Sequence, residues 1–196
     1  MRILLVYTHP VAESFTAAVR DVALAGLAEG GHEVRVTDLY AENFNPVMSR
    51  QDRLEYHNME INTRHVADHV ANLRWAEGLV FVFPTWNSGL PAMLKGWFDR
   101  VWVQGVGFVL KTGGVRQFVP TLTNIRLMVA LSTGGAPRFL TWLSGHPVRR
   151  MLMRGMRTQC HPRCKTIWMA LYRIDSSTQE MRAAHLARVR ARMARI

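Results

Sequence analysis

The stretch that decides the fold is LVFVFPTWNSGLPAMLKGWFDRVW, residues 79–102. It begins with five apolar residues, breaks at Pro84, and passes through a short loop before a helix that is expected to begin at Pro91. A strand that is apolar on both faces is typical of a parallel sheet covered by helices. Proline suits the first turn of a helix, where its missing N–H costs little. The sequence therefore predicts a central strand whose carboxyl end carries a loop, which is where open α/β sheets bind ligands.

The loop after this strand has the composition of a site for a flat ring. Trp86 supplies an indole and Asn87 an amide, so the loop could lie beside an aromatic ring system and form hydrogen bonds to its edge. The alternative is that Trp86 only packs and Asn87 is a turn residue. The position after a central strand favours the functional interpretation, and we expect a flavin.

Strand and helix patterns alternate along the whole chain, which predicts a single α/β domain over residues 1–196. Five strands separated by helices predict a doubly wound parallel sheet in a three-layer α/β/α arrangement. The Gly-rich stretch 105–123 is expected to be a loop. The predicted strands are residues 3–7, 33–39, 79–83, 125–131 and 165–171. The predicted helices are residues 15–28, 49–74 with an irregular start, 91–103, and 177–195, the last capped by Ser176 or Ser177. A long, less regular helical segment is expected over about 139–157.

The charge is unevenly distributed. Residues 1–148 carry 13 basic and 12 acidic residues, whereas residues 149–196 carry 12 basic and 2 acidic residues. Nucleic acid, an anionic membrane and the phosphates of NAD(P)H are all chemically suitable partners for the basic end. No nucleic-acid motif is present and no aromatic residues alternate with the arginines, so the sequence favours a solvated surface and no nucleic-acid partner.

The two cysteines, Cys160 and Cys164, lie in the sequence CHPRC. This spacing is not a zinc pattern and no second ligand pair exists, so we expect reduced thiols and no metal site. No apolar run approaches the roughly 20 residues that span a bilayer. The N-terminal MRILLVYTHP lacks the features of a signal peptide and is expected to be a strand. These observations together predict a cytoplasmic protein.

Two further loops should meet the first at one edge of the sheet. The loop after the first strand holds His9, Ser14 and Thr16 just before a helix N-terminus, where free N–H groups bind phosphate. The alternative is that Ser14 or Thr16 merely caps the helix. In the loop after the fourth strand, Gly134 and Gly135 would let the backbone approach a ligand and offer N–H groups to developing negative charge.

His146 lies eleven residues beyond Gly135. A lone histidine is more often structural than catalytic. It could protonate an acceptor oxygen if the intervening helix folds back over the ligand.

In this order the motifs resemble the flavodoxin-like NAD(P)H:quinone oxidoreductases, a family that includes DT-diaphorase-like enzymes, modulators of drug activity and the flavoprotein subunits of potassium efflux systems. The resemblance covers nearly the whole chain, and the segment LPAMLKGWFDRV is its most specific part. The segments that carry it are YTHP at 7–10 with Ser14-Phe15, DRLEYH at 52–57, residues 83–101, and STGG at 132–135.

The resemblance implies the strand order 2-1-3-4-5, a tightly bound flavin and a homodimer. It also implies a role for each loop. Residues matching His9, Ser14, Phe15 and Thr16 would hold the phosphate end of the flavin. Those matching Pro84, Thr85, Trp86, Asn87 and Ser88 would line its ring, and those matching Thr133, Gly134 and Gly135 would close the other edge. His146 matches the position of a catalytic histidine in some members.

The chain departs from this pattern in three ways. The ring loop Trp86-Asn87-Ser88 is smaller and more polar than the double tryptophan of many relatives, and is similar to the loop of FMN-dependent azoreductases. The tyrosine that partners the histidine has no match, because Phe139 and Leu140 occupy its region. The chain also lacks the C-terminal extension of the larger FAD enzymes, which favours FMN and leaves FAD as the alternative.

The resemblance implies an NAD(P)H-dependent flavin oxidoreductase that reduces quinones or similar flat acceptors by ping-pong hydride transfer. Two alternatives stay open. One is a non-enzymatic electron carrier of the flavodoxin type, although such carriers are usually acidic. The other is a regulatory flavoprotein subunit that docks on a membrane transporter through the basic C-terminal region.

Overall fold

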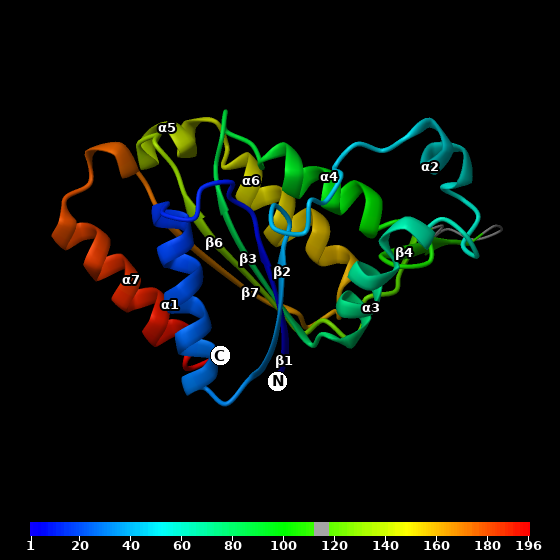
Figure 1. Ribbon diagram of the computed structural model, residues 1–196, viewed down its shortest axis with the longest axis horizontal. Coiled ribbons are helices and arrows are strands. Elements are labelled where there is room, and N and C mark those ends of the chain that lie inside the picture. The colour runs from blue at the N-terminus through cyan, green and yellow to red at the C-terminus, as the bar shows by residue number, and fades with distance from the viewer. Residues whose placement is uncertain (112–117) are drawn as a thin grey trace.

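The computed structural model describes residues 1–111 and 118–196 and is built around a five-stranded sheet (Figure 1). Its strand order is β2-β1-β3-β6-β7, and every neighbouring pair is parallel. This is the predicted order 2-1-3-4-5, which is confirmed. The strands are β1 (Arg2–Tyr7), β2 (Glu33–Asp38), β3 (Gly78–Pro84), β6 (Leu127–Thr133) and β7 (Lys165–Leu171).

Helices cover both faces of this sheet, as Figure 1 shows. The predicted three-layer arrangement is therefore also confirmed. One face carries α1 (Phe15–Glu29) and α7 (Gln179–Met193), which pack against each other. The other face carries α3 (Ala67–Trp75), α4 (Ala92–Val101) and α6 (Pro147–Arg150).

The continuous apolar run of β3 is explained by its central place in the sheet. All seven of its residues are buried. Leu79, Phe81 and Phe83 face the core beneath α4, whereas Val80 and Val82 face the core beneath α1. Burying a side chain of this size contributes about 1.5–3 kcal/mol, so both faces of the strand stabilise the fold.

The segment LPAMLKGWFDRV forms the buried helix α4. Leu94, Trp97, Phe98 and Val101 are buried at helical spacing. A Cβ at Gly96 would overlap the carbonyl oxygen of Pro46, so the glycine lets the preceding loop cross the helix at close range. Pro91 is the N-cap of α4 rather than its first helical residue.

The predicted helix 49–74 is wrong as a continuous element. The chain forms α2 (Arg50–Glu55), a 3-10 turn η1 (Arg64–Val66) and then α3. A capping box of Ser49 and Asp52 begins α2. The side-chain amide of Asn62 donates to the carbonyls of Tyr56 and Gln104, which fixes a turn between the helices.

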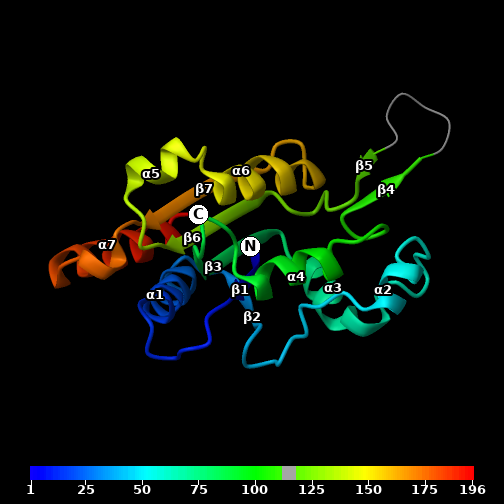
Figure 2. The same cartoon turned by 90° about the horizontal axis from the view of Figure 1, so that it is seen from above.

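The predicted loop 105–123 contains a strand pair. The strands β4 (Phe108–Leu110) and β5 (Phe118–Pro120) are antiparallel, with the rings of Phe108 and Phe118 stacked 4.9 Å apart. Residues 112–117 of that prediction lie outside the described residues. Figure 2 shows β4 and β5 extending from the body of the molecule at the same end as α2.

The predicted helix 139–157 is also interrupted. It consists of α5 (Arg138–Leu143), α6, a π-helical turn η2 (Met151–Gly155) and a 3-10 turn η3 (Met156–Gln159). Gly145 has a φ of +78° and ends the first piece.

The last helix begins later than predicted. A 3-10 turn η4 (Ile174–Ser176) precedes it, and the N-cap is Thr178. Ser177 is instead used by the turn, because its hydroxyl donates to the carbonyl of Ile174.

Both cysteines are buried free thiols, as expected. The Cys160 thiol lies beside the Cys164 thiol. The hydrogen bond between the two thiols, and then burial, raise the pKa of Cys160. Within the described ranges, no helix is both long and apolar enough to cross a bilayer.

Candidate functional site

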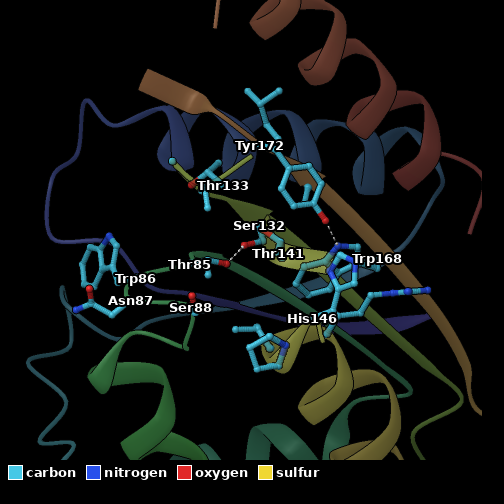
Figure 3. Close-up of a pocket in the computed structure, with 18 residues that line it drawn as sticks. Thr85, Trp86, Asn87, Ser88, Ser132, Thr133, Thr141, His146, Trp168 and Tyr172 are labelled. Carbon is cyan, nitrogen blue, oxygen red and sulfur yellow. Dashed lines mark hydrogen bonds between the residues drawn. The ribbon is translucent and has the colours of Figure 1, made fainter. Parts of the chain in front are cut away.

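A cavity of about 470 Å³ opens at the carboxyl ends of β3, β6 and β7 (Figure 3). This volume is within the range of sites for small molecules and cofactors. Trp86 and Asn87 lie on one side of the cavity, and Trp168, Tyr172 and His146 on the other. The predicted residues that line it are Thr85, Trp86, Asn87, Ser88, Thr133, Gly134, Gly135 and His146.

The loop after β3 forms a tight turn that presents backbone donors. Trp86 and Gly89 exchange hydrogen bonds of 3.2 and 2.8 Å, which close the turn. Between them, Asn87 and Ser88 have φ values of 47° and 61°, so both are left-handed. Neither of their N–H groups donates to an acceptor in the described part of the chain. Left-handed residues other than glycine store strain and gather at ligand sites, so this turn has the geometry of a binding loop.

Hydroxyl and amide bonds tie the loops after β3 and β6 together. Thr85 Oγ1 and Ser132 Oγ are 2.8 Å apart, and the Thr85 N–H donates to the Thr133 carbonyl at 2.7 Å. The two strands therefore deliver their loops to the cavity as one unit. Pro84, which ends β3, is buried and lies outside the cavity lining.

The glycine pair after β6 offers one free amide rather than two. The N–H of Gly134 donates to the Leu171 carbonyl at 2.9 Å, so the expected role of both amides is wrong for Gly134. The N–H of Gly135 has no acceptor among the described residues. A Cβ at Gly135 would lie 2.7 Å from Asp175 Oδ2, the end of an exposed side chain that can move away.

The loop after β1 lies beside the cavity without lining it. His9, Ser14, Phe15 and Thr16 are absent from the cavity wall. Thr16 Oγ1 is nevertheless 2.9 Å from Thr133 Oγ1 in a buried hydrogen bond. The ring centroids of His9 and Trp86 are 6.0 Å apart. These two contacts join the loop after β1 to the loops after β3 and β6.

The N-terminus of α1 is both capped and available. Ser14 Oγ accepts a hydrogen bond from the Ala17 N–H at 3.1 Å, so Ser14 is the N-cap. The N–H groups of Phe15 and Thr16 have no acceptor in the described segments. His9 Nδ1 lies 3.0 Å from the Val11 N–H and 3.2 Å from the Val11 carbonyl, so the contact with Val11 holds the ring beside the helix N-terminus. Capping and anion binding are therefore compatible here.

The structure brings His146 into the cavity. The break at Gly145 returns the chain to the cavity, and His146 precedes α6 with a left-handed φ of 50°. Its Nδ1 atom is buried and has no hydrogen-bond partner within residues 1–111 and 118–196. Strained backbone gathers at ligand sites and buried unpaired nitrogens are rare, so His146 is a candidate for contact with a ligand.

Two aromatic residues of the cavity were missed from the sequence. Trp168 and Tyr172 come from β7 and from the turn after it, and Trp168 Nε1 lies 3.4 Å from the Tyr172 hydroxyl. Phe139 and Leu140, by contrast, are exposed and do not line the cavity. The signal was available, because Tyr172 directly follows a parallel strand and the rule applied to β1, β3 and β6 holds for β7 as well.

The donor set suits an aromatic ring with polar edges and a phosphate tail. The cavity has aromatic walls, free amides at residues 87, 88 and 135, and a helix N-terminus close by. Thr8 Oγ1, at the end of β1, is fully buried and has no partner in the described ranges. Among those residues, no cluster of three or more His, Cys, Asp or Glu side chains could hold a metal ion.

Comparison with known proteins supports this assignment of the fold. A family model described as a flavodoxin-like fold matches residues 1–193. A ribosyldihydronicotinamide dehydrogenase-like protein from Penicillium crustosum is 36% identical over 155 residues, covering 69% of this chain and 58% of that protein. Rat (Rattus norvegicus) NAD(P)H dehydrogenase (quinone) 1 is 32% identical over 152 residues, covering 69% and 54%. The chain thus spans about half the length of the curated relatives it matches.

A solved structure extends the similarity over the whole chain. The NAD(P)H:quinone oxidoreductase from Methanothermobacter marburgensis superposes with a TM-score of 0.82 at 26% identity, covering 100% of this chain and 98% of that one.

Proposed function

The chain belongs to the family of proteins with a flavodoxin-like fold, and on that premise we propose that it is an NAD(P)H-dependent flavin oxidoreductase that reduces quinones or similar flat acceptors. The observation that carries the proposal is the cavity at the carboxyl ends of β3, β6 and β7, where one wall bears Trp86 and the other Trp168, Tyr172 and His146. The names of relatives, quinone oxidoreductases among them, point the same way.

The residues of the three loops fit a flavin. The free amides of Asn87, Ser88 and Gly135 would bind the polar edges of its ring. The amides of Phe15 and Thr16, with the Ser14 hydroxyl and the His9 imidazole, would bind its phosphate. When bound, the flavin would supply the electron transfer that amino-acid side chains cannot perform.

Two side chains can move or hold a proton beside the acceptor. His146 lines the cavity with an unpaired ring nitrogen, so it can donate to an acceptor oxygen. The hydroxyl of Tyr172, oriented by the Trp168 indole, stands on the same wall and can stabilise that oxygen by a second hydrogen bond. One cavity used in turn by donor and acceptor gives ping-pong kinetics.

We infer FMN as the flavin, because the loop after β3 is short and polar and one solved neighbour is named as an FMN-dependent azoreductase bound to FMN. Titrating the flavin-free protein with FMN and with FAD in parallel, and comparing the two Kd values, tests this inference. Tighter binding of FAD would contradict it. A cytoplasmic location agrees with the two free thiols and is tested by cell fractionation.

We further infer a homodimer. Apolar side chains are exposed where α2 and the β4–β5 pair lie together at one end of the molecule (Figures 1 and 2). Exposed apolar patches of this kind mark protein interfaces. Light scattering should give twice the mass of the chain, and Leu54→Glu should shift the protein toward the monomer. A monomeric wild type would refute the inference. The exposed side chains are Val47, Leu54, Met59, Leu110 and Phe118.

The direct test of function begins with the visible spectrum of the purified protein. We expect flavin absorption, release of the flavin on denaturation, and oxidation of NADPH or NADH with menadione as acceptor. A protein that takes up neither FMN nor FAD would exclude the proposal. A flavoprotein that leaves both donors unoxidised would instead support the electron-carrier alternative.

A further inference from the structure

A second cavity, of about 430 Å³, adjoins the candidate flavin site across the edge of the sheet. Strand β7 is the edge strand of the sheet, so half of its backbone groups face outward at this place. Five residues line both cavities and form the wall between them. They are His146, Arg149, Trp168, Ala170 and Tyr172. A dinucleotide with one end in each cavity would therefore pass over these five residues.

The second cavity is strongly cationic, and we call it the cationic groove. Three arginines from three different helices line it: Arg138 of α5, Arg149 of α6 and Arg188 of α7. Within the described ranges, none of these three guanidinium groups has a carboxylate partner at ion-pair distance. Elsewhere in the chain, exposed arginines such as Arg2 and Arg64 pair with glutamates. Three uncompensated arginines around one concave surface are suited to a ligand with several negative charges.

A buried histidine gives independent support. His185 of α7 lines the groove, is 1% exposed, and neither of its ring nitrogens has a partner in the described part of the chain. Burial first, and then the charge of Arg188, lower its pKa to about 4, so the ring is neutral and carries one N–H donor. Buried donors without a partner are rare in folded proteins. An oxyanion in the groove would supply the missing acceptor.

We propose that the cationic groove binds phosphate groups of a pyridine dinucleotide donor whose nicotinamide occupies the neighbouring cavity. The proposal rests on the proposed function, because the donor must reach the flavin site. Arginine is the side chain that binds phosphate with two parallel hydrogen bonds, and a dinucleotide spreads its phosphates along a chain as the groove spreads its arginines. NADPH carries one phosphate more than NADH and is therefore the preferred donor.

The first test measures anion binding without catalysis. Adenosine 2′,5′-bisphosphate, a fragment of NADPH without the nicotinamide, is titrated calorimetrically into the flavin-loaded protein. We expect Arg188→Gln and Arg138→Gln each to weaken binding about tenfold, as the loss of one charge-assisted contact does. Arg192→Gln is the matched control. It removes the same charge from α7, the helix of Arg188, but Arg192 is exposed and does not line the groove.

The second test compares donors that differ in their phosphates. Arg188→Gln should raise the KM for NADPH about tenfold, raise that for NADH less, and leave that for dihydronicotinamide riboside, which has no phosphate, unchanged. A change in KM confined to a sulfonated quinone would assign the groove to the acceptor and overturn the proposal. Equal binding of the bisphosphate by wild type, both groove variants and the control would also overturn it. Arginine-dependent binding in a protein without turnover would instead refute the oxidoreductase function and keep the anion site.

Discussion

The buried hydrogen bond between Thr16 and Thr133 joins the loop after β1 to the loop after β6. Its removal should lower the free energy of unfolding. The two hydroxyl oxygens are 2.9 Å apart, and the residues are 3% and 4% exposed. Thr16→Val preserves the shape of the side chain and leaves the Thr133 hydroxyl without its partner. A buried unpaired polar group costs about 1–3 kcal/mol. We expect the free energy of unfolding to fall by about 2 kcal/mol, which is roughly a thirtyfold change in the unfolding equilibrium.

A double-mutant cycle isolates this hydrogen bond. Thr133→Val alone should cost a similar amount, because it orphans the Thr16 hydroxyl. The double variant leaves no unpaired group, so it should cost clearly less than the sum of the singles, with a coupling energy of about 1–2 kcal/mol. Urea denaturation of the flavin-free protein provides the measurement. Thr166→Val is the control, since Thr166 is exposed on β7, and its effect should stay within about 0.5 kcal/mol.

Two results would refute the reasoning. If the single variants are as stable as the control, the hydroxyls are not desolvated in solution. If the cost of the double variant equals the sum of the singles, the two side chains do not interact. If the coupling energy is positive, Thr16→Val should also bind flavin more weakly. The variant loosens the loop after β1, although Thr16 does not itself line the cavity.

Three further outcomes are expected. Gly96→Ala should lower the free energy of unfolding by about 3 kcal/mol or more in urea denaturation, since its Cβ would overlap the backbone of Pro46; a small change would mean that the crossing loop can move away. Ser88→Gly should raise stability by about 1 kcal/mol in the same assay, because it relieves a left-handed φ of 61°, and a loss of stability would contradict the assigned strain. His185 has its pKa lowered to about 4, below the unfolded value near 6.5, so the unfolded state binds more protons and wild-type stability should fall by up to about 3 kcal/mol as the pH drops from 6.5 to 4. This slope should flatten in His185→Leu, and an unchanged slope would show that His185 does not titrate in this range.

The sequence predicted the sheet because its signal is strong and local. Strands β3 and β6 are buried on both faces, so their apolar runs are continuous, and their places in the order were implied by the family resemblance. The helices were predicted less well. The breaks at Asn62 and Gly145 depend on hydrogen bonds and left-handed backbone that hydrophobic periodicity does not reveal. The β4–β5 pair was missed because three-residue strands carry almost no pattern.

The candidate site was predictable where residues follow a strand directly, and less so elsewhere. The loops after β1, β3 and β6 adjoin one another as the crevice rule requires. The sequence could not reveal that the Gly134 N–H donates to the Leu171 carbonyl, because this depends on the register of β7 against β6. Nor could it show that His185, fourteen residues beyond the end of β7 in a helical pattern of ordinary appearance, is buried with unpaired nitrogens.

The strained residues of this chain are concentrated where a ligand would lie. Asn87, Ser88 and His146 all have left-handed φ values and all line the cavity. Asn87 and Ser88 closely follow β3, which is buried along its whole length, so the rigid sheet can impose a backbone conformation that these two residues would not adopt alone. The same turn that strains Asn87 and Ser88 turns their amides away from other backbone acceptors. The strain and the unpaired N–H donors thus have one cause. A ligand that accepts hydrogen bonds from these two N–H groups stabilises the strained turn relative to other conformations of the loop. It follows that flavin should protect the loop after β3 from hydrogen exchange more than it protects the exposed helix α5, although both lie at the same edge of the sheet.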